Sequence, residues 1–241
     1  MRRYRGLTPR ERAARRRELI LEAGLELFGT VGYAHATVRE VSRTANLNSR
    51  YFYESFPDRE TLLIAVYERI VIELAAAVSA ATAGARTVAE QAEAGLRAAW
   101  RLLTSDRRKA RVLVLEVVGV SERLERLRRA YRHGFAALLV DNAVRVVGEG
   151  ESTALDPELI ARALIGGFLD VLLDWLNGDL DLPDEQIVAH FTALYTAAAA
   201  AALGTTTEEL NRRIREAPPP PVALDVERVR AEAGLPPANL P

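Results

Sequence analysis

The sequence predicts an all-α protein, with a small N-terminal unit followed by a larger helical bundle. Helix starts are marked by capping boxes, in which Thr8, Thr37 and Thr87 are each followed by Glu three residues later. Apolar residues then recur at spacings of three and four, as on one face of a helix. No alternating strand pattern and no internal repeat is present.

Composition is that of a globular protein. The 241 residues are 49% hydrophobic and 27% charged, which is enough for a substantial core and argues against disorder. Cys is absent, so disulfides and thiolate metal sites are excluded, and a reducing cytoplasm is compatible. No apolar signal core follows the basic start, and the Ala-rich run near residue 197 is too weakly hydrophobic to suggest a membrane span.

The net charge of −1 hides a basic N-terminus. Residues 1–17 contain eight Arg and one acidic residue, Glu11. Such an end points to contact with a polyanion, although a solvated, frayed terminus is the alternative. We expect residues 1–7 to form a flexible arm in which Arg2, Arg3 and Arg5 follow a DNA minor groove.

Helices follow one another along the whole chain. The expected segments are 9–29, 37–45, 48–56, 59–84, 87–104, 106–118, 121–148, 156–176, 183–204, 206–216 and 224–233. The run Pro218–Pro221 must be extended. The helix 59–84 is long enough to join one domain to another.

Residues 37–63 have the pattern of a helix-turn-helix leading into a third helix. Asn46 lies in a tight turn and tolerates the left-handed backbone that such a turn requires. Asn48 or Ser49 can cap the second helix, in which Phe52 and Phe56 form the buried face.

The opposite face of that helix is polar and aromatic, as suits a helix in a DNA major groove. The candidates for contact with base edges are Asn48, Ser49, Arg50, Tyr51 and Glu54. Arg50 has the geometry to bind guanine through two hydrogen bonds. Thr37 and Arg39 at the preceding helix start suit a phosphate, and Tyr53 and Arg59 suit the DNA backbone. The alternative for Tyr51 and Tyr53 is simple packing within the small domain.

At this point the sequence resembles the N-terminal domain of the TetR family of bacterial transcription regulators. The resemblance covers residues 12–70 and rests on ILEAGLELF at 20–28, Gly32-Tyr33, TVREV at 37–41, Ala45-Asn46-Leu47 and YFYESFPDRETLL at 51–63. Asn46 stands where the family usually has Gly. The remainder is similar only in its helical architecture.

The resemblance implies a homodimer that reads a palindromic operator, and a C-terminal pocket whose small-molecule ligand weakens DNA binding. In this family the last two long helices form the dimer interface as a four-helix bundle. Here the matching residues are Ile160, Leu164, Gly167, Phe168, Val171, Trp175, Phe191, Leu194 and Ala198. An ordinary intramolecular core is the alternative for these residues.

An effector pocket is expected where polar or aromatic groups interrupt apolar helices. The candidates are Trp100, Glu116, His133, Phe135, Asn142, Asp170 and Asp174. Each is also compatible with a surface or core position, and the two Asp residues with ion pairs at the dimer interface.

Enzyme functions find little support. The three His residues lack metal-ligand spacing, and no nucleophile motif or phosphate-binding Gly loop is present, so we expect no cofactor or metal. We expect an arm at 1–7, a DNA-binding domain at 8–60, a ligand-binding and dimerisation domain at 61–216 and a Pro-rich extension at 217–241. The function predicted is a cytoplasmic, dimeric, ligand-released repressor. The alternatives are a constitutive DNA-binding regulator and an all-helical enzyme or carrier.

Overall fold

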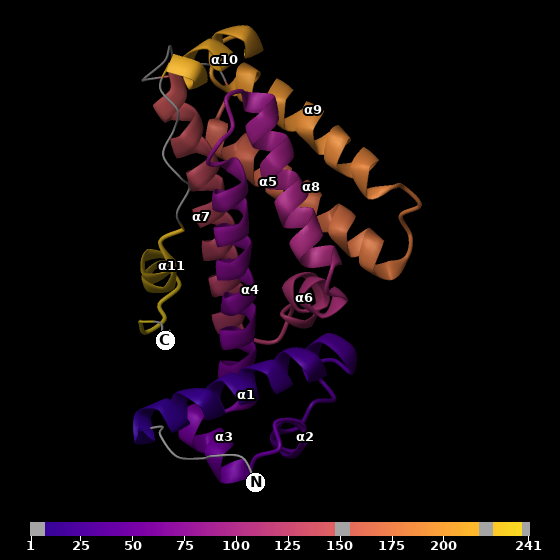
Figure 1. Ribbon diagram of the computed structural model, residues 1–241, viewed down its shortest axis with the longest axis vertical. Coiled ribbons are helices and arrows are strands. Elements are labelled where there is room, and N and C mark those ends of the chain that lie inside the picture. Colours follow the sequence, from indigo (N-terminus) through magenta and orange to yellow (C-terminus); the bar gives the residue numbers. More distant parts are fainter. Residues whose placement is uncertain (1–7, 148–154, 217–223, 238–241) are drawn as a thin grey trace.

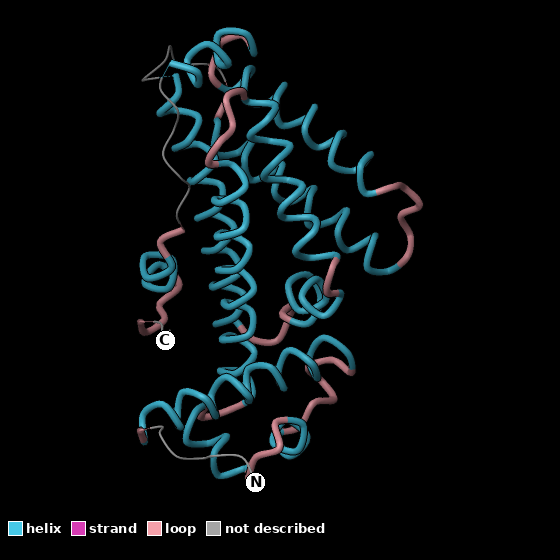
Figure 2. The backbone as a smooth tube through the Cα atoms, in the orientation of Figure 1, coloured by secondary structure: helices cyan, strands magenta, loops and turns pink. Residues whose placement is uncertain are grey.

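Helices make up the architecture in the computed structural model, which describes residues 8–147, 155–216 and 224–237. Within these ranges there is no strand (Figures 1 and 2). The α-helices are α1 (Pro9–Thr30), α2 (Val38–Thr44), α3 (Ser49–Ser55), α4 (Arg59–Thr82), α5 (Val88–Thr104), α6 (Arg107–Arg111), α7 (Glu122–Val147), α8 (Pro157–Asn177), α9 (Asp184–Ala202), α10 (Thr207–Glu216) and α11 (Val226–Glu232). The fold class predicted from the sequence is confirmed.

The predicted helix starts are confirmed at the level of their hydrogen bonds. The amide of Glu40 donates to the Thr37 hydroxyl at 3.2 Å, and the Thr37 amide donates to the Glu40 carboxylate at 2.8 Å. Asn46 has a φ of 54°, the left-handed value that the turn between α2 and α3 requires. Asn48 caps α3 by accepting from the Arg50 amide at 2.9 Å.

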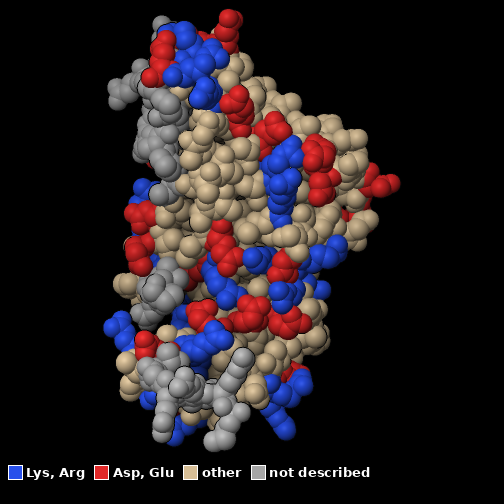
Figure 3. All heavy atoms as spheres, in the orientation of Figure 1, with Lys and Arg blue, Asp and Glu red and all other residues tan. Residues whose placement is uncertain are grey.

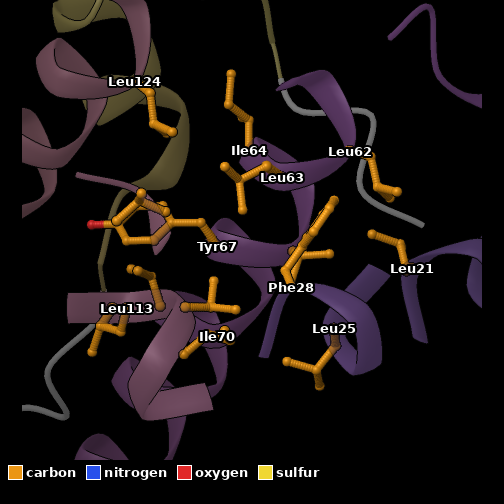
Figure 4. Close-up of a cluster of buried hydrophobic side chains, with 14 of the residues drawn as sticks. Leu21, Leu25, Phe28, Leu62, Leu63, Ile64, Tyr67, Ile70, Leu113 and Leu124 are labelled. Carbon is orange, nitrogen blue, oxygen red and sulfur yellow. The ribbon is translucent and has the colours of Figure 1, made fainter. Parts of the chain in front are cut away.

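Helices α1, α2 and α3 close around a small apolar core. Phe28, Phe52 and Phe56 are essentially inaccessible to solvent, as the sequence predicted for the last two. Leu62 and Leu63 from the start of α4 complete this core (Figure 4). The first turns of α4 therefore belong to the N-terminal unit.

Beyond this core, α4 continues as the central helix of a larger bundle. Figure 1 shows it running from α1 at one end of the molecule to the turn before α5 at the other. It packs along α5, which in turn packs along α9, while α7 lies along α8. No single described helix is long and apolar enough to cross a membrane, and the one pair that passes jointly, α9 with α10, is bent by 97°.

The segment between α5 and α7 differs from the single short helix predicted there. After α6, residues Val112–Glu116 form one turn of π-helix. Such turns shift the register of side chains and often occur at functional sites. The change of winding follows the packing of this segment against α1 and α8, which the sequence does not reveal.

The C-terminal helix α11 packs against α7 of its own chain, a question that the sequence left open. Its Arg230 forms an ion pair through two hydrogen bonds with Glu68 of α4, and both side chains are buried. The hydroxyl of Tyr131 on α7 donates to the same carboxylate at 3.1 Å. Burial raises the pKa of Glu68, while Arg230 and Tyr131 oppose that rise.

Loss of Arg230 tests how firmly α11 is held. Arg230→Met leaves the Glu68 carboxylate buried without a counter-ion, unless α11 moves away. We expect the free energy of unfolding to fall by about 3–5 kcal/mol. The double substitution with Glu68→Met should recover most of that loss. Urea unfolding at fixed protein concentration measures both effects, together with hydrogen exchange in residues 226–232.

Arg228→Met is the matched control, because Arg228 is exposed on the same helix and pairs with Glu232 at 3.6 Å. It should change stability little. Equal stability of the Arg230 and Arg228 variants would show that the buried ion pair does not hold α11.

Candidate DNA-binding face and ligand cavity

Helix α3 presents a polar face directly opposite its buried Phe52. Arg50 has 83% of its side chain exposed, and Tyr53 is 61% exposed. The Arg50 Nε donates to the Glu54 carboxylate at 3.0 Å, and Glu54 also lies 3.6 Å from Arg16 of α1. Glu54 takes up only part of the five N–H donors of Arg50, so the side chain keeps donors for another acceptor.

Tyr51, also predicted to contact bases, lies partly inside the unit. The guanidinium of Arg16 covers its ring at 4.4 Å from the centroid. Of the two tyrosines for which packing was the alternative, Tyr51 is half-buried, while Tyr53 is exposed and its ring packs edge-on against Phe52 with the centroids 5.4 Å apart. On this face Arg50, Tyr53 and Glu54 are exposed and Ser49 is half-buried.

The residues expected to contact DNA phosphates differ in whether their side chains are available. Arg39 is exposed at the start of α2, but the Thr37 hydroxyl is engaged by Glu40 at 2.8 Å. Arg2, Arg3 and Arg5 lie outside the described residues and stay a prediction.

Arg59 is occupied within the protein. Its guanidinium donates to the carbonyl of Tyr33 at 3.1 Å and to that of Ala36, and it lies 4.9 Å from the centroid of the Tyr33 ring. It fixes the loop between α1 and α2 to the start of α4. The structure thus favours an intramolecular role for Arg59 over the predicted contact with the DNA backbone.

A cavity of about 210 Å³ lies within the bundle, between α4, α5, α7, α8 and α9. One water needs about 10–15 Å³ by the same measure, so the space far exceeds a packing defect. Most of the lining is aliphatic or aromatic. The polar side chains in it are Tyr67, Thr82, Gln91, Tyr131, Arg132 and Tyr195. A ligand here would be held mainly by its apolar surface.

Of the six suggested effector-pocket residues whose side chains are described, Phe135 alone lines this cavity. Trp100 is buried in an aromatic cluster with two rings of α8, and Glu116 lies elsewhere, as described below. The side chain of Asn142 is outside the described residues. Exposed positions are occupied by His133, Asp170 and Asp174. The sequence search looked for polar interruptions, whereas the cavity is formed by apolar faces that fail to meet.

The cavity is connected to the N-terminal unit through the π-turn. Leu113 of this turn lines the cavity, and Glu116 at its end accepts a hydrogen bond from the Tyr33 amide at 2.7 Å. The same carboxylate accepts from Arg111 Nε at 2.7 Å. Glu116, predicted as a pocket residue, therefore joins the bundle to the loop between α1 and α2. Nothing in the sequence signals this contact over 83 residues.

Helix α6 reinforces that junction. Arg108 lies 2.7 Å from Glu26 of α1, and Lys109 lies 2.6 Å from Glu73 of α4. A Cβ added to Gly29 would overlap Arg108, so α1 and α6 approach closely because residue 29 is glycine. Figure 3 shows acidic and basic side chains interleaved in a band across the molecule at the level of these two helices.

The outer face of α8 and α9 exposes apolar and small residues alongside charged ones such as Arg162 and Asp170. Leu159 is 62% exposed and Leu194 54% exposed. Between them lie small side chains, and a Cβ at Gly166 or Gly167 would meet nothing within 4 Å. Exposed leucines beside small residues leave room for a close approach by another helix.

The residues predicted for a dimer interface divide between the two sides of these helices. Gly167 and Leu194 lie on the outer face. Leu164, Phe168 and Phe191 line the cavity within this chain, and their place in a dimer interface stays a prediction.

The remaining predicted interface residues are partly buried. Ile160 and Ala198 line a smaller cavity beside the first. Trp175 packs against Trp100 and lies beneath the guanidinium of Arg107, and Val171 is also half-buried. The set of α8 residues predicted for the interface was large because this helix has apolar side chains on both sides.

Comparison with known proteins agrees with this architecture. Residues 20–66 match the family model described as bacterial regulatory proteins, tetR family. These residues run from α1 through the helix-turn-helix into the first turns of α4. No match was found among curated proteins.

Solved structures share the fold over most of the chain. The fatty acid degradation regulator FadR from Bacillus halodurans is 19% identical, with 79% of this chain and 96% of that chain covered and a TM-score of 0.67. FadR from Bacillus subtilis, solved in complex with stearoyl-CoA, is 18% identical, with coverage of 76% and 98% and a TM-score of 0.65. A transcriptional regulator from Pseudomonas aeruginosa PAO1 is 23% identical, with coverage of 84% and 97% and a TM-score of 0.64. The sequence match to this family thus covers residues 20–66, and over most of the chain the likeness to these regulators is one of fold.

Proposed function

We propose that this protein is a homodimeric repressor, acting in the cytoplasm, that leaves a palindromic operator when a small molecule fills the cavity. One observation carries the proposal: α4 forms part of the N-terminal core and also lines the cavity. Leu62 and Leu63 pack in the N-terminal core, and Val71 and Leu74 line the cavity. A ligand that moves α4 therefore moves the helix-turn-helix.

DNA recognition requires two copies of α3 at a fixed distance. In the proposed dimer, the outer faces of α8 and α9 from two subunits form a four-helix bundle. The two α3 helices then lie about 34–36 Å apart, one turn of DNA, and reach successive major grooves. Arg50, Tyr53 and Glu54 face the bases there.

Release requires that the ligand bind the DNA-incompetent arrangement more tightly, because equal affinity for both states would shift nothing. Two contacts are placed to transmit the change. One is α4 itself. The other is the π-turn, in which Leu113 contacts the ligand space and Glu116 holds the Tyr33 amide.

The lining favours an effector with an aliphatic chain. The cavity offers mostly Leu, Val, Ala and Phe surfaces, and burial of methylene groups there contributes about 0.8 kcal/mol each. The fold is shared with a regulator solved in complex with stearoyl-CoA, which makes a long-chain acyl compound the first candidate.

Filling the cavity tests ligand-dependent release. Ala92 is buried in the lining on α5, and Ala92→Phe should occupy part of the ligand space. We expect this variant to bind the operator normally but to resist release by long-chain acyl compounds. The operator comes from selection of bound genomic fragments, and fluorescence anisotropy of a labelled fragment measures release.

Ala94→Phe is the control, because Ala94 lies on the same helix outside the lining. It should be released like the natural protein. If no compound in a broad screen releases the natural protein from its operator, the constitutive regulator is the better description.

Arg50→Ala tests the reading face. Loss of a two-point contact with guanine should remove about 1–3 kcal/mol of discrimination in each half-site. The ratio of affinities for the operator and a scrambled fragment, measured at one salt concentration, reports this loss. Arg86→Ala removes the same charge from the exposed turn at the far end of α4 and should leave the ratio unchanged. Retained selectivity in the Arg50 variant would mean that other residues read the operator.

Leu194→Asp tests the dimer. A carboxylate in the proposed four-helix bundle would be buried without a partner, so we expect a monomer with greatly weakened operator binding. Sedimentation velocity measures the oligomeric state. Val118→Asp is the matched change, since Val118 is 52% exposed and lies outside α8 and α9, and it should stay dimeric. A dimeric Leu194 variant would exclude this interface.

A further inference from the structure

The apolar cavity carries one cation in its described lining. Arg132 of α7 lies at the exposed edge of the cavity and forms no ion pair or hydrogen bond with any described residue. Arg128, one helical turn before it, instead lies 2.7 Å from Glu125. Within the described part of the chain, Arg132 therefore keeps all five guanidinium donors available at the mouth of an apolar space, although the charge of Glu125 acts on it.

A second donor lies close to it. Tyr67 of α4 lines the cavity, is 4% exposed, and has no hydrogen bond between its hydroxyl and the described residues. Figure 4 shows that hydroxyl directed away from Phe28 and the N-terminal core. Burial dominates and raises the pKa of Tyr67, while the charges of Arg128 and Arg132 both act on the phenol and oppose that rise. The phenol thus stays protonated and can donate.

The neighbouring tyrosine is not available in the same way. The Tyr131 hydroxyl donates to Glu68 at 3.1 Å, and its ring packs edge-on against Tyr67 with the centroids 5.8 Å apart. That packing fixes the direction of Tyr67. The corner of the cavity between α4 and α7 therefore combines two free donors, and no carboxylate lines the described cavity beside them.

We infer that the natural ligand is an amphipathic anion, whose aliphatic chain fills the cavity and whose carboxylate or phosphate binds Arg132 and Tyr67. This inference rests on the proposed function, because it assigns the head group of the same effector. A neutral chain would leave both donors without an acceptor from the ligand, and a cationic head group would be repelled. Hydrogen bonds between a charged pair are about twice as strong as neutral ones, so selectivity for an anion is the measurable consequence.

Head-group selectivity is measured with compounds that share one chain. The neutral fluorophore N-phenyl-1-naphthylamine reports occupancy of the cavity in the full-length dimer. Dodecanoate, dodecanol, dodecyltrimethylammonium and dodecanoyl-CoA compete for it, each below its critical micelle concentration. We expect dodecanoate or dodecanoyl-CoA to displace the fluorophore at concentrations about tenfold or more below dodecanol. Comparison of these two acyl compounds distinguishes a carboxylate from a phosphate as the anion.

Three variants assign the selectivity to this corner. Arg132→Gln should remove most of the preference for the anion while leaving dodecanol binding unchanged, and Tyr67→Phe should weaken the preference less. Arg129→Gln removes an exposed charge from the same helix outside the lining and should keep the natural preference. Unchanged dodecanol binding shows that the cavity remains folded in each variant.

Three results would overturn the inference. Equal displacement by dodecanol and both anions is one, and retention of the preference in the Arg132 variant is another. In either case, release of the operator by dodecanol would leave the proposed function standing. The third is failure of every compound, including the fluorophore, to bind or to release the operator, which would overturn the proposed function as well.

Discussion

Helix α4 packs in both halves of the protein, so it cannot shift in one half without shifting in the other. Its first turns supply Leu62, Leu63 and Val66 to the core around α1, and Gly24 of α1 allows Leu62 and Val66 to approach closely. From Tyr67 onward the same helix lines the cavity. Packed interiors resist gradual deformation, so a change at the cavity is transmitted along α4 rather than absorbed within it.

The junction of α6 with the π-turn adds a second constraint, independent of α4. Apolar contacts hold α4 in the N-terminal unit, whereas this junction is held by ion pairs and by the hydrogen bond from Tyr33 to Glu116. These polar contacts are partly buried, and salt screens them more than it affects the apolar contacts of α4. The junction is therefore the more sensitive of the two to ionic strength.

The parts of this architecture that follow local rules could be predicted from the sequence. Capping boxes mark where α1 and α2 begin, the Thr87 hydroxyl alone caps α5, and Asn46 indicated the left-handed turn before α3. The cavity could not be predicted, because a void depends on which apolar faces fail to meet in three dimensions. Glu116 shows the same limit: its partner is an amide 83 residues away, and no periodicity encodes that contact.

Adjacent residues of α4 connect the cavity to the C-terminal segment. Tyr67 lines the cavity, while Glu68 is directed to Arg230 of α11. Tyr131 belongs to both sites, because it lines the cavity and donates to Glu68. A ligand that displaces the ring of Tyr131 would weaken one of the bonds to the Glu68 carboxylate, and a buried carboxylate needs all its partners. The C-terminal segment, expected from the sequence to be a Pro-rich extension with one helix, is thus fastened at the turn of α4 where the cavity and the N-terminal core meet.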